Sequence, residues 1–127
     1  MSNVSSEIIN SIQLSKIIVV LVIEDDSKAS DLIDCLYDSG IKNYEIALRT
    51  NNSRKSADII SKKGLDINLG IGTVLNTDDV NFAADIGANF ALAPGTNKTV
   101  IDKANRLNLP FFPGVCTPSD IEKANEI

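Results

Sequence analysis

The sequence has no histidine at all, and it has only two cysteines among its 127 residues. Without histidine, a zinc site that mixes Cys and His ligands cannot be built. Two cysteines without a secretion signal do not make a disulfide framework. We therefore expect a reduced, cytoplasmic protein that needs neither a metal nor an organic cofactor.

Long apolar runs and a basic leader are also missing. The longest apolar stretch, residues 17–23, is far shorter than the ~20 residues that span a bilayer. The formal net charge is −5, whereas nucleic acids and anionic membranes need a clustered basic surface. We expect neither export nor a membrane or nucleic-acid partner, although an anionic small molecule can bind through a local cation.

Short apolar runs are what the sequence does contain. Its 43% hydrophobic and 23% charged residues are typical of one globular domain. Five apolar runs bounded by turn residues recur about every 20 to 25 residues, which suits strand-plus-helix units. The expected strands lie at residues 17–22, 44–48, 67–71, 90–93 and 110–112.

The segments between these runs have the period of amphipathic helices. Apolar residues recur at helical spacing before Gly40, Gly64, Gly87 and Pro110, so we expect a helix to end at each. Cys35, beside Leu36 on the first of these helices, is expected to be a buried thiol. A further helix is predicted to begin at Thr117, where a hydroxyl, a proline and a carboxylate follow in the order of an N-terminal cap.

Regular alternation of strand and helix predicts an α/β protein with a parallel sheet, either open and doubly wound or a (β/α)₈ barrel. Five units cannot close an eight-stranded barrel, which needs at least ~200 residues. We expect residues 1–127 to form a single domain; if it is of the barrel type, it is partial and holds about five of the eight units. A short helix is expected before the first strand, at residues 4–15.

Glu45 and Arg49 are the charged residues of the second predicted strand. The strand period places Tyr44, Ile46 and Leu48 on one face, and Glu45 and Arg49 on the other. In a barrel the apolar face packs on helices, so the charges point inward, about 13 Å apart if the strand stays extended. They serve either a small bound acid or a structural network with neighbouring strands.

Turn residues follow the next three strands. Gly70 and Gly72 let the backbone approach a ligand, or they fit a tight turn into a helix capped by Asn76 or Thr77. Pro94 and Pro113 each precede a glycine, which makes a sharp turn at the face where barrel active sites lie. Rigid turns are the simpler interpretation of both proline-glycine pairs.

Four segments together resemble the class I aldolases that act on 2-keto-3-deoxy-6-phosphogluconate (KDPG) and 4-hydroxy-2-oxoglutarate (KHG). They are residues 45–50 (EIALRT), 70–75 (GIGTVL), 93–95 (APG) and 112–118 (FPGVCTP). The resemblance extends through the whole chain, and it implies the α/β fold of a parallel (β/α) TIM-type barrel, incomplete here with about five of eight units. It implies cleavage of either keto acid through a lysine Schiff base, giving pyruvate with glyceraldehyde 3-phosphate or glyoxylate.

The resemblance also implies roles for individual residues. Glu45 is the proton carrier, Arg49 and Thr73 hold the pyruvyl carboxylate, and Pro94 helps to wall the pyruvate pocket. The resemblance further implies a homotrimer for the intact protein, since trimers are common among similar enzymes. An arginine fork matches a planar carboxylate, and a desolvated carboxylic acid can have its pKa raised toward working pH, so the chemistry of these residue types agrees.

The sequence departs from that family in one respect. The Schiff-base lysine of relatives lies on a sixth strand in a segment like Lys-Phe-Phe-Pro, and this sequence has no such segment. We expect the 127 residues alone to be an inactive gene fragment. The alternatives are a non-catalytic carboxylate-binding or assembly module of this descent, and a different phosphate-binding barrel enzyme.

Overall fold

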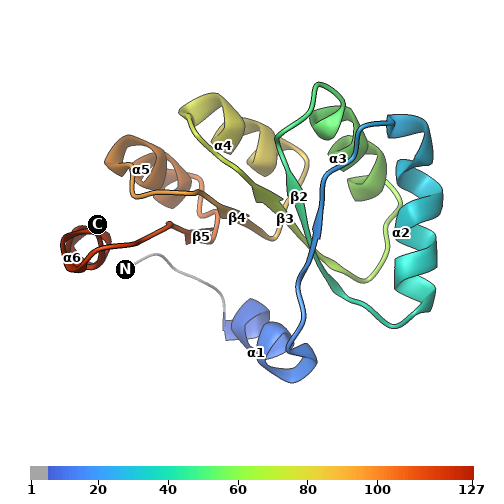
Figure 1. The fold of residues 1–127 in the computed structure, drawn as a ribbon, viewed down its shortest axis with the longest axis horizontal. Helices are drawn as coiled ribbons and strands as arrows, with labels where there is room; N and C mark the ends of the chain where they lie inside the picture. The colour runs from blue at the N-terminus through green and yellow to red at the C-terminus, as the bar shows by residue number, and fades with distance from the viewer. Residues whose placement is uncertain (1–5) are drawn as a thin grey trace.

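The computed structural model describes residues 6–127, and their strands and helices alternate as expected (Figure 1). The elements are α1 (Ser6–Ser15), β1 (Val19–Leu21), η1 (Asp26–Lys28), α2 (Ala29–Asp38), β2 (Asn43–Ala47), α3 (Ser53–Ser61), β3 (Asn68–Gly72), α4 (Thr77–Asp85), β4 (Phe90–Leu92), α5 (Lys98–Arg106), β5 (Phe111–Phe112) and α6 (Pro118–Glu126). Residues 4 and 5 of the expected first helix lie outside the described residues.

All strand pairs in the sheet are parallel, and their spatial order is β1-β2-β3-β4-β5. Each strand therefore lies beside the next strand of the sequence. A doubly wound sheet instead reverses its order at a switch point, so the observed order is that of an incomplete (β/α) barrel.

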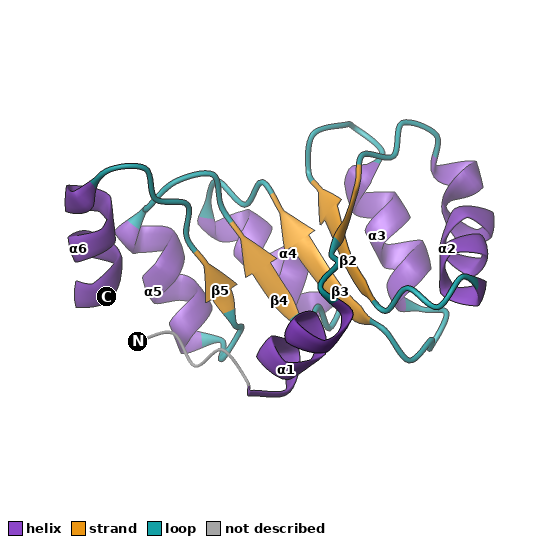
Figure 2. Cartoon of the chain, turned by 60° about the horizontal axis from the view of Figure 1, so that its bottom comes forward, coloured by secondary structure: helices purple, strands orange, loops and turns teal. Residues whose placement is uncertain are grey.

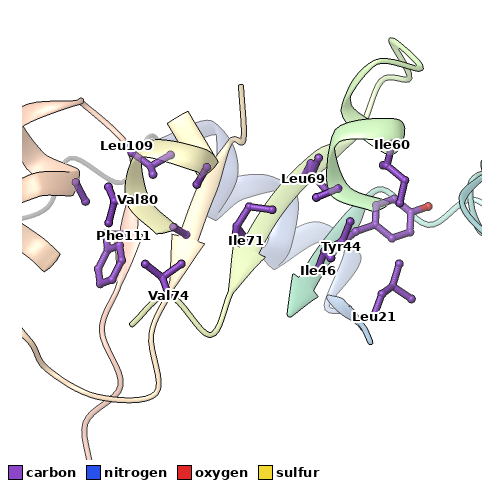
Figure 3. Close-up of a cluster of buried hydrophobic side chains, with 14 of the residues drawn as sticks. Leu21, Tyr44, Ile46, Ile60, Leu69, Ile71, Val74, Val80, Leu109 and Phe111 are labelled. Atoms are coloured by element: carbon purple, nitrogen blue, oxygen red, sulfur yellow. The ribbon is translucent and has the colours of Figure 1, made fainter. Parts of the chain in front are cut away.

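The outer face of the sheet, which α2, α3, α4 and α5 cover, holds the main core (Figures 2 and 3). One row across it consists of residues paired from strand to strand, all of them buried: Leu21, Ile46, Ile71, Ala91 and Phe111. The neighbouring Tyr44 is also fully buried, and Leu48 packs against this cluster. The predicted outward face of β2 is confirmed.

The inner face of the sheet carries a different row, in which Val20, Glu45, Gly70 and Phe90 are paired in register. Val20 is exposed, and the buried Phe90 makes an edge-to-face contact with Phe112, with ring centroids 5.9 Å apart. Helix α1 lies at the N-terminal end of the strands, away from their C-terminal ends (Figure 2).

The helix ends follow the sequence pattern. Gly40, Gly64 and Gly87 each have a positive φ, the left-handed conformation that commonly follows a helix. After α5, where no glycine is available, Asn108 adopts a φ of 53°. At α6, Thr117 and Asp120 form a complete capping box, as predicted.

Three details differ from the sequence expectations. The first strand is shorter than expected and begins at Val19, and β5 begins at Phe111. In the described part of the chain both strands pair on one side only, so fewer ladder bonds hold their ends. Cys35, which the helical pattern places beside Leu36 as a buried thiol, is exposed because the buried side of α2 runs through Ala29 and Ile33. Among residues 6–127, no helix is long and apolar enough to cross a membrane.

Candidate active site

The C-terminal ends of β2, β3 and β4 bring the four predicted site residues to one edge of the sheet. Glu45 lies within β2, and Arg49 follows that strand by two residues. Thr73 comes directly after β3, and Pro94 follows β4 by two residues. This is the edge at which parallel barrels place their active sites.

Glu45 leans toward that edge. Its Cα pairs with Gly70, yet a Cβ built on Gly72 would fall on the Glu45 carboxylate. Two residues of strand correspond to a rise of about 6.6 Å. The carboxylate therefore lies nearer to the C-terminal edge of the sheet than the Glu45 Cα does, and it is beside Gly72, the residue that precedes Thr73.

The Glu45 carboxylate is partly buried, and this burial raises the pKa of the group. Removal from water penalises the charged form, whereas the nearby Arg49 guanidinium acts in the opposite direction and lowers the pKa. Burial is the larger effect. Glu45 thus keeps its proton to a higher pH than an exposed glutamate, which suits a group that both accepts and donates a proton.

Arg49 and Thr73 are in direct contact. The Arg49 Nε donates a hydrogen bond of 3.3 Å to the Thr73 Oγ1. A guanidinium has five N–H donors, so the terminal nitrogens keep donors for a bound anion. The side chain of Arg49 is exposed enough for such a ligand to reach it.

The expectation of one extended strand from Glu45 to Arg49 is wrong. Strand β2 ends at Ala47, and the Arg49 N–H bonds back to the Ala47 carbonyl at 2.8 Å, so the chain bends at Leu48. The bend and the lean of Glu45 together bring the carboxylate nearer to the guanidinium than the straight-strand estimate of about 13 Å. The influence of Arg49 on the pKa of Glu45 agrees with this arrangement.

Thr73 has a φ of 60°, which a β-branched residue seldom adopts. Its neighbours hold it there: the Val74 N–H donates to the Leu92 carbonyl at 3.0 Å, and the Leu75 N–H donates to Asp79 Oδ2 at 2.9 Å. Strain of this kind is concentrated at functional sites. Because Thr73 has the positive φ and Gly72 is still part of β3, Thr73 makes the turn after this strand, and the interpretation of Gly72 as the turn residue is wrong.

Asp79 is a supporting residue that the sequence reading missed. It is buried at the start of α4, and its second oxygen accepts a 2.6 Å bond from Arg54 of α3. The guanidinium of Arg54 also lies over the Phe82 ring, 4.8 Å from its centroid. The signal was present, since Asn76 and Asp79 have the spacing of a capping box.

Pro94 lies at the rim of an open hollow of about 220 Å³ between the loops that follow β3 and β4. Val74 and Leu75 line one side of this hollow, and residues 93–97 line the other. Gly114 packs tightly against the Pro94 carbonyl, where a Cβ would collide. The two proline-glycine turns thus support each other, as rigid turns do.

The family comparison agrees with this geometry. Residues 8–127 match the family described as KDPG and KHG aldolase. The chain belongs to this family. The 2-dehydro-3-deoxy-phosphogluconate aldolase of Haemophilus influenzae is 30% identical over 127 residues, which cover all of this chain and 60% of that protein. The KHG/KDPG aldolase of Escherichia coli K12 is 28% identical over 83% of this chain and 49% of its own length.

Solved structures of aldolases have the same fold. The KDPG aldolase of Zymomonas mobilis ZM4, solved with 3-phosphoglycerate, superposes with a TM-score of 0.80 at 28% identity, covering 86% of this chain and 52% of that one. The Legionella pneumophila enzyme, with pyruvate captured as a covalent carbinolamine, gives 0.79 at 28% identity, over 85% and 53% of the two chains. This chain thus spans about half to three fifths of its aldolase relatives.

No lysine is among the groups that shift the pKa of Glu45, on which Arg49 is the charged group that acts. All lysines of the sequence fall within the described residues, and six of them form ion pairs with aspartates. Five of these six lie in or against helices, and Lys42 pairs with Asp66 before the N-terminal ends of β2 and β3. Lys103 and Lys123 belong to α5 and α6, and Lys16 follows α1.

Proposed function

We propose that Glu45, Arg49, Thr73 and Pro94 form the proton-transfer and carboxylate-binding half of an aldolase active site. The reaction is cleavage of a 2-keto-4-hydroxy acid to pyruvate and an aldehyde. With KDPG the aldehyde is glyceraldehyde 3-phosphate, and with KHG it is glyoxylate. The contact between Arg49 and Thr73, beside the partly buried Glu45, is the observation that carries the proposal.

Binding begins with the keto-acid carboxylate. The terminal nitrogens of Arg49 pair with its two oxygens, because a planar guanidinium fits a planar carboxylate in two parallel hydrogen bonds. The Thr73 hydroxyl fixes the guanidinium through Nε, which reduces the freedom that the side chain loses when it binds. Pro94, at the rim of the hollow between the loops after β3 and β4, would form a rigid wall beside the bound acid.

Proton transfer is the task of Glu45. As a carboxylate it accepts the proton of the C4 hydroxyl while the bond between C3 and C4 breaks, and as an acid it returns a proton to the pyruvyl C3. Burial raises its pKa, and both protonation states are then populated closer to neutral pH. A positioned acid or base of this kind contributes about 10²- to 10⁴-fold in rate.

The electron sink for this cleavage is an iminium formed between the keto carbon and a lysine amine. Ion pairing and position make the nine lysines of this chain unsuitable, so the amine comes from a segment outside these 127 residues. Such a segment also supplies the strands that close the barrel. By itself the chain forms no covalent intermediate.

A chimera tests the proposal. Residues 1–127 would be joined to the part of the Haemophilus influenzae aldolase that the alignment does not cover. We expect borohydride with pyruvate to label one lysine of the added part, and KDPG or KHG to release pyruvate. A chimera that folds, by circular dichroism, but neither traps pyruvate nor cleaves either keto acid would refute the assignment.

A carboxylate-binding or assembly module is the second candidate. The exposed Val20 of β1 and Val22, just after that strand, favour it, because they leave apolar surface at the edge strand open to another chain. Two measurements on the 127-residue chain, its oligomeric state and its binding of pyruvate, help to separate this module from the aldolase. A soluble oligomer that binds pyruvate through Arg49, together with an inactive chimera, would select the module.

A further inference from the structure

Two glycines on the inner face of β3 leave a strip of bare backbone between Glu45 and Phe90. Neither Gly70 nor Gly72 has a positive φ, so the backbone at both positions suits any L-residue. Chain conformation therefore gives no reason for glycine here. The reason is space, and the two positions make space for different side chains.

At Gly70 the space is filled by an aromatic ring. An added Cβ would lie 2.6 Å or less from ring atoms of Phe90, a side chain that is fully buried. At Gly72 the space is filled by the carboxyl end of Glu45, whose Oε1, Cδ and Cγ are the three atoms nearest to an added Cβ. Each glycine thus accommodates one specific neighbour.

We infer that Gly72 is a positioning residue for Glu45: the missing side chain at 72 makes the room in which the carboxylate lies beside Thr73. The inference rests on the proposed function for its catalytic meaning, but its geometry does not depend on that function. If position 72 carried a methyl group, the carboxylate would have to swing away from the backbone of β3. A displacement of about 1 Å at a catalytic group can cost about 10²-fold in rate.

A double-mutant cycle in stability tests this fit. We expect Gly72→Ala to lower the unfolding midpoint by about 2 °C, because the partly buried Glu45 side chain must leave its position to admit the methyl group but can turn toward water. In a Glu45→Ala background the same change should lower the midpoint by less than about 1 °C, because the colliding atoms are gone. An equal loss in both backgrounds would overturn the inference.

Gly70→Ala is the matched control, on the same strand and the same face. Its collision is with Phe90, so Glu45→Ala should not relieve it. If Gly72→Ala does not fold at all, the Glu45→Ala and Gly72→Ala double variant must fold for the inference to stand. A double variant that also fails to fold would overturn it.

A second measurement follows the carboxylate itself. In the Gly72→Ala protein, carbon-detected NMR titration should show that the pKa of Glu45 moves down toward its ordinary value, because the displaced group meets water. An unchanged pKa would contradict the inference. In the active chimera, Gly72→Ala should lower kcat about 100-fold with little change in KM. A positive stability cycle in an inactive chimera would refute the proposed function and leave the positioning role intact.

Discussion

The two ends of the inner face of the sheet are built on opposite principles. At the N-terminal end, the fully buried Asn43 accepts hydrogen bonds from Ser11 and Asn68, and its amide donates to Ser15 and to the Ile17 carbonyl. At the C-terminal end, a partly buried carboxylate has a raised pKa, and a threonine has a strained backbone. One end is satisfied by the protein itself, and the other keeps unused capacity for a ligand.

This difference shows where the fold gains stability and where it gives stability up. Helix α1 closes the N-terminal end through the network around Asn43, and Asn68 also donates to Ser11 at 2.8 Å. Satisfied buried networks of this kind make the structure rigid. The C-terminal end carries a strained threonine and a partly buried carboxylate, costs that the proposed reaction would offset.

Glu45→Gln should have the largest effect, and it acts at the C-terminal end. In the active chimera we expect kcat to fall about 1000-fold while KM changes little, because the amide cannot transfer the proton. Stopped assays of pyruvate release measure this change. A fall of less than tenfold would mean that another group carries the proton.

Asn43→Ala acts at the opposite end. Loss of the side chain removes its hydrogen bonds and leaves buried partners unsatisfied, so the free energy of unfolding should fall by about 3 kcal/mol. Urea denaturation measures this loss, and Asn89→Ala, at an exposed side chain with one hydrogen bond to β3, is a milder control. If both variants lose the same stability, the N-terminal network has no special role.

Arg49→Lys sharpens the account of carboxylate binding. Lysine keeps the positive charge but loses the fork and the bond from Nε to Thr73, so KM for the keto acid should rise about 10- to 30-fold. The value of kcat should change less than KM. A lysine variant with the KM of the parent would show that charge alone binds the substrate.

Thr73→Gly should separate strain from function. Glycine adopts a φ of 60° without steric cost, so the free energy of unfolding should rise by about 1 kcal/mol. Loss of the hydroxyl should at the same time raise the KM of the active chimera for the keto acid. Thr73→Ala is the control, because it loses the hydroxyl but keeps a Cβ in the strained conformation. Equal stabilities of the glycine and alanine variants would argue against strain.

The smallest effect is the dependence of stability on pH. Burial raises the pKa of Glu45 in the folded state above that in the unfolded chain, so the unfolded chain loses this proton first. As pH rises through the folded-state pKa, the parent protein should lose stability relative to Glu45→Gln, and the difference should level off above it. If the parent instead gained stability relative to Glu45→Gln as pH rises, the pKa of Glu45 would be lowered by folding, and the account of its burial would be wrong.

Local pattern in the sequence was sufficient for the alternation of strands and helices, the helix ends that glycines mark and the two faces of β2, whereas it left the strand order open between a doubly wound sheet and a barrel. It also brought Glu45, Arg49 and Thr73 to one edge, since strand ends in a parallel sheet meet there. It did not reveal the bend at Leu48, which depends on a bond between Arg49 and Ala47, or the positive φ of Thr73. These features are set by contacts between segments.

The support around the site was also beyond sequence reasoning. Asp79 and Arg54 are 25 residues apart, and only the fold, which places Arg54 of α3 next to Asp79 and Phe82 of α4, brings them together. The room that Gly72 leaves for Glu45 depends on the register of β2 with β3, which alternation does not fix. The prediction of a buried Cys35 failed because helical spacing alone left the angle of α2 undetermined.

Pyruvate binding by the 127-residue chain is the most direct test of the difference between the two ends. In an amide and arginine side-chain NMR titration, we expect the Arg49 Nε–H and the Thr73 amide to shift, the Asn43 and Asn68 amides to stay in place, and pyruvamide, which has no charge, to have no effect. Arg49→Ala should abolish the shifts. Shifts at the N-terminal end, or none at Thr73, would contradict the account.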